Sequence, residues 1–213
     1  MLYFLSFILF FVNSCTEKNK DQSIICTGEN TVQFPPDAFA RFYFKDSTFW
    51  IYKDSASGQL DSAWVFNSKT GTAPIQTSDA NSKGKCYQYG EYDIKSLLGI
   101  DYSFSLFPTG GNGGANYFDL RLQILNTSTY IVYANLKENM YRDEGIADGI
   151  IDSLSAIHVN GKDYTDVLVR RSTIPVTYPD VFSTAYYVKN IGLIKYMRPN
   201  GSVWELVKYK TKQ

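Results

Sequence analysis

The chain has 213 residues with 21 basic and 21 acidic side chains, so its formal net charge is zero. Nucleic-acid binding requires a basic surplus or patch, and this balance argues against nucleic acid as a partner. Only one histidine, His158, is present, which excludes a three-histidine metal site. The 17 tyrosines and 14 phenylalanines, with recurrent Val, Ile and Thr, favour strand over helix.

The first element in chain order is an apolar segment, residues 2–12, which carries no charged side chain. It is shorter than the roughly 20 residues that a membrane-spanning helix needs. Its length fits the apolar region of a secretory signal, and small Ser14 stands where a signal peptidase requires a small side chain. We therefore predict a signal peptide over residues 1–14. An ordinary cleaved signal and an uncleaved amino-terminal anchor are the alternatives.

The end of this segment resembles the signal of bacterial lipoproteins, in which Leu or Val, a small residue and Gly, Ala or Ser precede the acylated cysteine. Val12, Ser14 and Cys15 match that pattern, and Asn13 departs from it. The resemblance implies lipid attachment at Cys15 and a membrane of the cell envelope as the partner. Thr16, in place of Asp after the acylated cysteine, implies sorting to the outer membrane.

Residues 15–30 are the predicted tether, because the stretch after Cys15 is polar and has no apolar period. The remaining residues, 31–213, are long enough to form one domain. Acylation of Cys15 would leave Cys26 and Cys86 as an even pair in an oxidising compartment. A disulfide between them is one interpretation, and two buried free thiols are the other.

From Phe39 onward, short apolar runs alternate with turn residues, which is typical of antiparallel strands. Gly58 supplies the flexibility for one hairpin loop, and Asn160-Gly161 is the strongest two-residue hairpin signal in the chain. The predicted strand pairs are residues 49–52 with 63–66, 117–124 with 130–136, 156–159 with 164–169, and 185–189 with 193–196, followed by a last strand at 203–209.

Helix is expected to be minor and limited to turns near residues 92–98 and 136–142. The predicted fold class is all-β, with one mostly antiparallel domain of about ten to twelve strands. A sandwich and a strongly curved or half-barrel sheet both fit this pattern. No repeat of 20 to 50 residues is visible.

Three blocks of the chain resemble uncharacterised bacterial envelope lipoproteins. In those proteins a Trp-x-Tyr strand precedes an Asp-Ser-x-x-Val strand, and here Trp50-Ile51-Tyr52 precedes Asp61-Ser62-Ala63-Trp64-Val65. The blocks at residues 159–167 and 187–196 are also similar. The resemblance implies an all-β lipoprotein and carries no catalytic residue to transfer.

Three other stretches are candidates for chemistry. Residues 143–152 resemble a calcium loop only superficially, because aligning Gly149 with the invariant glycine puts Ile146 and Ser155 at ligand positions. The glycine-rich stretch 107–115 lacks the Gly-Lys-Ser/Thr ending of a phosphate loop. His158 lies in an alternating strand with no nucleophile placed beside it by strand spacing, so a surface or core role is the better interpretation.

The sequence thus predicts no enzymatic activity and no catalytic, cofactor-binding or metal-binding residue. It indicates a membrane-anchored protein with a binding or structural role and an unidentified ligand. Alternatives in the same class are a carrier of apolar ligands and a glycan-binding module that uses aromatic side chains. The alternative from another class is a hydrolase built on carboxylates of the acidic loop. Those carboxylates belong to Asp143, Glu144, Asp148 and Asp152.

Overall fold

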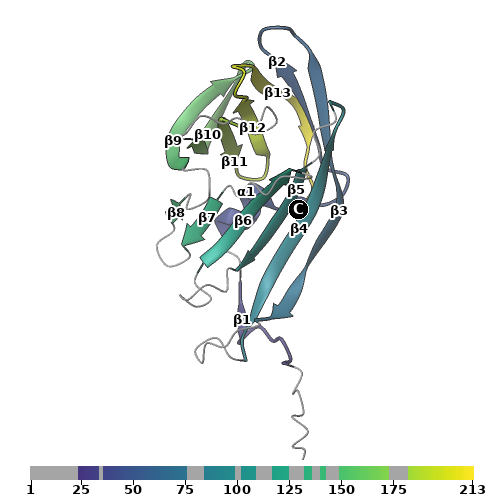
Figure 1. Cartoon of the computed structure of the whole chain (residues 1–213), viewed down its shortest axis with the longest axis vertical. Helices are drawn as coiled ribbons and strands as arrows, with labels where there is room; N and C mark the ends of the chain where they lie inside the picture. Colours follow the sequence, from purple (N-terminus) through teal and green to yellow (C-terminus); the bar gives the residue numbers. More distant parts are fainter. Residues whose placement is uncertain are drawn as a thin grey trace, which may run out of the picture.

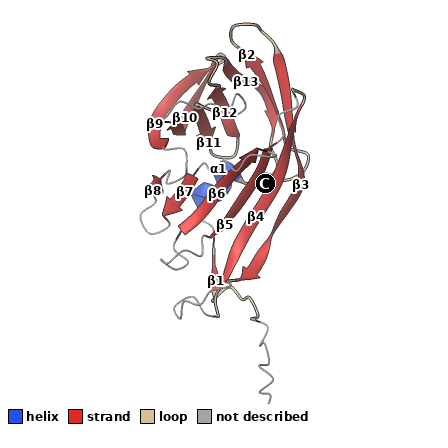
Figure 2. Cartoon of the chain, viewed as in Figure 1, coloured by secondary structure: helices blue, strands red, loops and turns tan. Residues whose placement is uncertain are grey.

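The computed structural model describes residues 24–33, 36–75, 84–98, 102–108, 117–124, 132–135, 140–142, 149–172 and 182–213. The described chain consists mainly of strands, with one short helix (Figure 2). In chain order the elements are β1 (Thr31–Val32), α1 (Pro36–Phe42), β2 (Phe49–Asp54), β3 (Leu60–Pro74), β4 (Cys86–Ser96), β5 (Tyr102–Pro108), β6 (Tyr117–Ile124), β7 (Val132–Asn135), β8 (Met140–Arg142), β9 (Gly149–Val159), β10 (Lys162–Ser172), β11 (Thr184–Val188), β12 (Gly192–Met197) and β13 (Val203–Lys210).

The described strands form one continuous sheet, which confirms the all-β, mostly antiparallel prediction. Its order is β8-β7-β6-β5-β4-β3-β2-β13-β12-β11-β10-β9, and β1 pairs with β4 in the parallel sense. The sheet curves strongly, so that its two arms lie on either side of α1 (Figure 1). Of the two predicted architectures, the structure therefore has the curved sheet, because a sandwich would divide the strands between two sheets.

The predicted turns form as their residue types require. Asn160 and Gly161 both have positive φ, 45° and 79°, which is the requirement of the type I′ turn that suits a two-residue hairpin. Val159 and Lys162 are the paired residues on either side of it. The loop between β2 and β3 has Gly58 at φ 74°, and there the Ser57 backbone N–H donates to Asp54 Oδ2 at 3.1 Å.

The predicted hairpins are also confirmed at the level of the backbone. β2 pairs with β3, β6 with β7, β9 with β10, and β11 with β12, which is followed by β13. Side-chain orientations along β6 and β7 lie outside the described residues. Strand pairing was predictable because alternation and turn residues are both local signals.

Three segments differ in secondary structure from the prediction. Phe39, from which the strand pattern was predicted to begin, lies in helix α1. This helix starts at Pro36, whose missing N–H suits the first turn of a helix. Asp37 and Arg41, one helical turn apart, form an ion pair that supports the helix. Conversely, the turn predicted near residues 92–98 is largely strand β4, and the end of the one predicted near 136–142 is strand β8.

The core lies on the concave side of the sheet and is rich in aromatic rings. Phe42 packs edge-on against Tyr187, and Phe44 packs edge-on against Trp50. Six tyrosines are buried in it, Tyr43, Tyr52, Tyr92, Tyr164, Tyr187 and Tyr196. These aromatic rings thus pack against one another inside the domain.

We predict that Gly192→Ala destabilises the protein strongly. Gly192 has φ 85°, and a Cβ there would lie 2.9 Å from the ring of Phe44, which is itself held against Trp50. The positive φ costs an alanine about 1 to 2 kcal/mol, and the overpacking about 1 to 3 kcal/mol more. Urea unfolding followed by tryptophan fluorescence measures the sum.

The matched control is Gly201→Ala in the turn before β13. Gly201 has φ 84°, but a Cβ there would meet no atom within 4 Å. This variant should show the φ cost alone. Equal losses in the two variants would mean that Phe44 does not restrict the space beside Gly192.

Candidate functional site

A cavity lies between the strands of the curved sheet and α1. It is lined mainly by aromatic side chains, together with two charged residues, Arg41 and Asp61. The cavity volume is about 40 Å³. A buried water needs about 10 to 15 Å³ on the same measure, so the cavity has room for about three water molecules.

The polar groups around this cavity are already bonded to the protein. The Trp50 indole donates to the Ile191 carbonyl at 2.6 Å, and the Tyr52 hydroxyl donates to the Leu193 carbonyl at 2.9 Å. The Tyr92 hydroxyl donates to the Phe42 carbonyl at 2.7 Å. Because these donors are occupied, they fix the walls of the cavity and leave few groups to orient a polar ligand.

Burial changes the acidity of the tyrosines around this cavity. It raises the pKa of Tyr52 and of Tyr92 well above the ordinary value, because a phenolate there would lose its hydration. Burial likewise raises the pKa of Tyr187 to about 12, although Arg170 opposes the shift. Burial also raises the pKa of Tyr196. These hydroxyls are therefore neutral hydrogen-bond donors at neutral pH.

Asp61 brings a carboxylate to the same cavity and is 3 % exposed. The Ser96 hydroxyl lies 2.9 Å and 3.0 Å from its two oxygens. β3 and β4, which hold these two residues, pair antiparallel next to each other. The carboxylate is thus bonded by its neighbour in the sheet, and the arrangement is that of a buried polar contact.

Arg41 lies at the edge of the cavity and joins α1 to the far arm of the sheet. Its Nε atom is 2.9 Å from Asp37 Oδ2, and its Nη2 atom is 2.8 Å from Asp166 Oδ1. Its Nη1 atom donates to the carbonyls of Asp166, at 2.7 Å, and Tyr187, at 3.3 Å. Lys189 Nζ lies 2.8 Å from Asp166 Oδ2 and also pairs with Asp37.

The charges of this cluster stabilise one another. Burial alone would lower the pKa of Arg41, but its bonds to Asp37 and Asp166 outweigh burial and raise it. The hydrogen bond from Lys189, followed by that from Arg41, lowers the pKa of Asp166. Two cations and two carboxylates balance, so we interpret the cluster as a structural link between α1 and the β10 and β11 strands.

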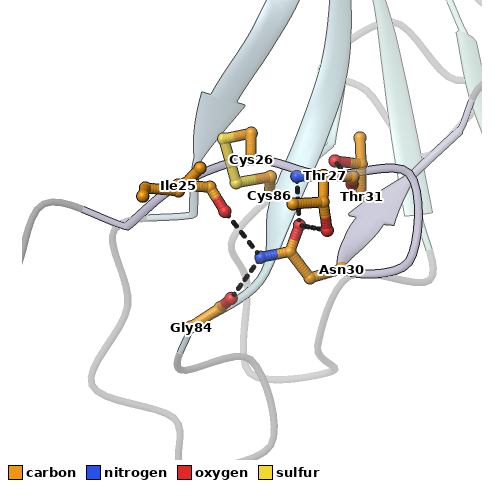
Figure 3. Close-up of a disulfide and its surroundings, with 7 residues drawn as sticks. All are labelled: Ile25, Cys26, Thr27, Asn30, Thr31, Gly84 and Cys86. Carbon is orange, nitrogen blue, oxygen red and sulfur yellow. Dashed lines mark hydrogen bonds between the residues drawn. A yellow bond between two sulfur atoms is a disulfide. The ribbon is translucent and has the colours of Figure 1, made fainter.

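The two cysteines predicted as a pair lie at the end of the sheet where the amino-terminal segment arrives. Cys26 and Cys86 form a disulfide, with their Cα atoms 5.6 Å apart (Figure 3). The Asn30 side-chain amide donates to the Ile25 carbonyl at 3.0 Å and to the Gly84 carbonyl at 3.2 Å. The last part of the predicted tether, residues 25–30, is thus fastened to the start of β4 both covalently and by hydrogen bonds.

The other sequence candidates do not come together in a site. Cys15 and the acidic residues Asp143, Glu144 and Asp148 lie outside the described residues, as does most of the glycine-rich stretch 107–115. Asp152 forms an ion pair with Arg171 on the neighbouring strand. His158 is exposed, and its Nδ1 atom lies 2.6 Å from Asp163 Oδ1.

Sequence reasoning missed the buried polar residues at the cavity. Arg41 and Asp61 have no local pattern that marks them, since their partners are up to 146 residues away. The available signal was the pair Asp37 and Arg41 at helical spacing after a proline. This pair lies in the segment around Phe39, where the sequence predicted the beginning of the strands.

Comparisons with known proteins identify no relative. No protein-family model, no curated protein and no solved structure matches the chain. Within the described residues, no helix has both the length and the apolar character needed to cross a membrane. In that same part of the chain, no three His, Cys, Asp or Glu side chains gather closely enough to hold a metal ion.

Proposed function

We propose that this protein is a lipoprotein of the bacterial cell envelope, held at the membrane through acylated Cys15, with a binding or structural role and no catalysis. The disulfide between Cys26 and Cys86 is the observation that supports this proposal most. Structural disulfides persist in oxidising compartments outside the cytosol. The chain has three cysteines, and this pairing leaves Cys15 at the position where the signal pattern expects acylation.

The attachment of the domain is consistent with such an anchor. Residues 15–23 connect the acylation site to the disulfide-bonded segment that begins the described domain. Burial of acyl chains contributes about 0.8 kcal/mol per CH₂ group, so the two or three chains of a lipoprotein suffice for stable membrane binding. By the resemblance to lipoprotein signals, Thr16 after the cysteine favours the outer membrane.

The size of the interior cavity distinguishes between binding of a ligand inside the domain and binding on its surface. At about 40 Å³ it is far smaller than the several hundred Å³ that a lipid or a drug-sized ligand occupies. This size favours binding on the outer surface of the domain, or a structural role, over carriage of an apolar molecule inside it. Trp50 and Trp204 are also buried, so neither offers a face on which a sugar ring can stack.

The proposal predicts that Cys15→Ser abolishes lipid labelling. In a bacterium with an outer membrane, the wild-type protein should incorporate an alkyne-tagged fatty acid and co-fractionate with the outer membrane. The variant has no thiol to receive diacylglycerol and should carry no label. Gel detection of the tag, followed by density-gradient separation of the membranes, measures both effects.

The matched control is the double variant Cys26→Ser with Cys86→Ser, which removes the disulfide and leaves the acylation site. It should take up the label like the wild type, even if the domain is less stable. Label on Cys15→Ser, or none on the wild type, would refute the anchor. Label on the wild type that is found only in the inner membrane would refute the outer-membrane assignment.

A further inference from the structure

The outer edge of β9 is an open edge of the sheet. β9 is the last strand at one end of the sheet (Figure 1), and it pairs with β10 through one edge. No strand among the described residues pairs with the other edge. Most side chains from Asp152 to His158 are exposed, and Leu154 and Ile157 are partly so. An open edge of this length is a template for another strand.

The turn at Asn160-Gly161 determines which backbone groups of β9 face outward. In a two-residue hairpin the flanking residues, Val159 and Lys162, exchange hydrogen bonds. Alternation then directs the odd-numbered residues of β9 toward β10. The N–H and C=O groups of the even-numbered residues, from Asp152 to His158, therefore point away from the sheet.

The stretch 153–157 of this edge carries no charge, lysine or proline that would oppose strand addition. Edge strands are commonly protected by lysine, proline, bulges or charges near their middle. Residues 153–157 of β9 are Ser-Leu-Ser-Ala-Ile, without a charge or a proline. The charged or ionisable side chains, Asp152 and His158, stand symmetrically on either side, each three residues from Ser155.

We propose that two copies of this protein pair along β9, antiparallel, about a two-fold axis at Ser155. In this register the outward-facing residues of the two copies meet, with Asp152 opposite His158 and Leu154 opposite Ala156. Shifting the register by two residues would keep the backbone bonds but separate Asp152 from His158. Ser155 meets its own counterpart in a non-hydrogen-bonded pair, where small side chains allow the Cα atoms to approach to about 4.5 Å.

The neighbouring strand extends the charge pattern across the two-fold axis. Within one copy, Asp152 is paired with Arg171, and His158 is paired with Asp163. In the dimer each copy would place an Arg171 and Asp152 pair beside a His158 and Asp163 pair of the other. With a proton on both ring nitrogens, the His158 imidazolium donates through Nδ1 to Asp163 and through Nε2 to Asp152 of the other copy. This complementarity favours a second copy over an unrelated peptide as the occupant of the edge.

A site-specific cross-link tests the register. In a Cys15→Ser background, where Cys26 and Cys86 are already bonded, Ser155→Cys adds a single free thiol. Across the axis its Cα separation of about 4.5 Å lies within the range for a disulfide. Mild oxidation of the purified full chain should give a covalent dimer on a non-reducing gel. Because Cys15 is absent, the result does not depend on the lipid anchor.

Ser153→Cys in the same background is the matched control, on the same strand and the same face. In the proposed register Ser153 lies opposite Ile157 of the other copy, so the two introduced thiols are separated by four residues along the strand, or about 14 Å. This variant should give about tenfold less covalent dimer. Equal yields from the two positions, or no dimer from Ser155→Cys, would overturn the proposed register.

Sedimentation of the uncross-linked protein gives an independent measurement. Ala156→Pro removes an N–H that points outward, so it should leave the pairing with β10 intact while blocking addition of a strand. The parent chain should show a concentration-dependent dimer, and Ala156→Pro should be monomeric with an unchanged circular dichroism spectrum. A parent chain that stays monomeric at every soluble concentration would refute the dimer.

Discussion

Arg41→Met is expected to lower the free energy of unfolding by about 3 to 5 kcal/mol, out of a total that is commonly about 5 to 15 kcal/mol. The side chain is 4 % exposed, and methionine replaces its volume but none of its hydrogen bonds. The carbonyls of Asp166 and Tyr187 would each lose a charged donor. Lys189 would remain beside Asp37 and Asp166, but a single ammonium cannot reproduce the forked contacts of a guanidinium.

An exposed ion pair provides the control for this substitution. Lys69 pairs with Glu91 at 3.5 Å, and its side chain is 68 % exposed. Lys69→Met should therefore change the free energy of unfolding by no more than about 0.5 kcal/mol. Urea unfolding at neutral pH compares the two variants. If Arg41→Met were as mild as Lys69→Met, the cluster would not be the link between α1 and the sheet that its geometry indicates.

The elements that sequence predicted correctly depend on neighbours along the chain. The Asn160-Gly161 turn forms because both residues adopt positive φ readily, and the strands beside it follow from alternation. The β2 and β3 pairing follows from apolar runs on either side of a loop with Gly58. These signals operate over a few residues, so they are visible before the fold is known.

The elements that the sequence did not predict depend on contacts between residues that are far apart in the chain. α1 has only seven residues, too few for a helical period to stand out, and its place is determined by packing of Ala38 and Phe42 in the core. The predicted turn in residues 92–98 is strand because Tyr92 lies inside the β4 ladder, with its hydroxyl bonded to Phe42. Tertiary context overrides local propensity in both segments.

In the candidate site, too, some features were predictable from the sequence and others depend on the fold. Cysteine counting gave Cys26 and Cys86 as a possible pair, although only the fold brings their Cα atoms to 5.6 Å. The abundance of tyrosine indicated sheet, but it could not distinguish surface rings from core rings. The buried position of Tyr52 and its bond to the Leu193 carbonyl join residues 141 positions apart. No local pattern encodes such a contact.

The buried tyrosines predict that the protein loses stability steeply above pH 10. A tyrosine has a pKa of about 10 in the unfolded chain, whereas burial raises the pKa of Tyr187 to about 12 in the folded protein. Between these values the folded state keeps a proton that the unfolded state releases. The stabilising contribution is therefore complete below pH 10 and is lost as the pH rises through that window.

The size of this effect follows from the number of protons involved. Each such tyrosine lowers the free energy of unfolding by about 1.4 kcal/mol per pH unit within the window. Burial also raises the pKa of Tyr52, Tyr92 and Tyr196, so four groups act together. Their combined slope of up to about 5 kcal/mol per pH unit would exhaust an ordinary stability within about one to three pH units.

Two signals recorded during an alkaline titration test this prediction. Ultraviolet absorbance reports phenolate formation, and circular dichroism reports loss of the sheet. The buried tyrosines should ionise only as the sheet is lost, in one cooperative step. Tyr52→Phe should make the fall in stability with pH shallower by about 1.4 kcal/mol per unit, while its lost hydrogen bond lowers stability at neutral pH by about 1 kcal/mol. Complete ionisation of all tyrosines with the sheet intact would show instead that these hydroxyls reach solvent in the folded protein.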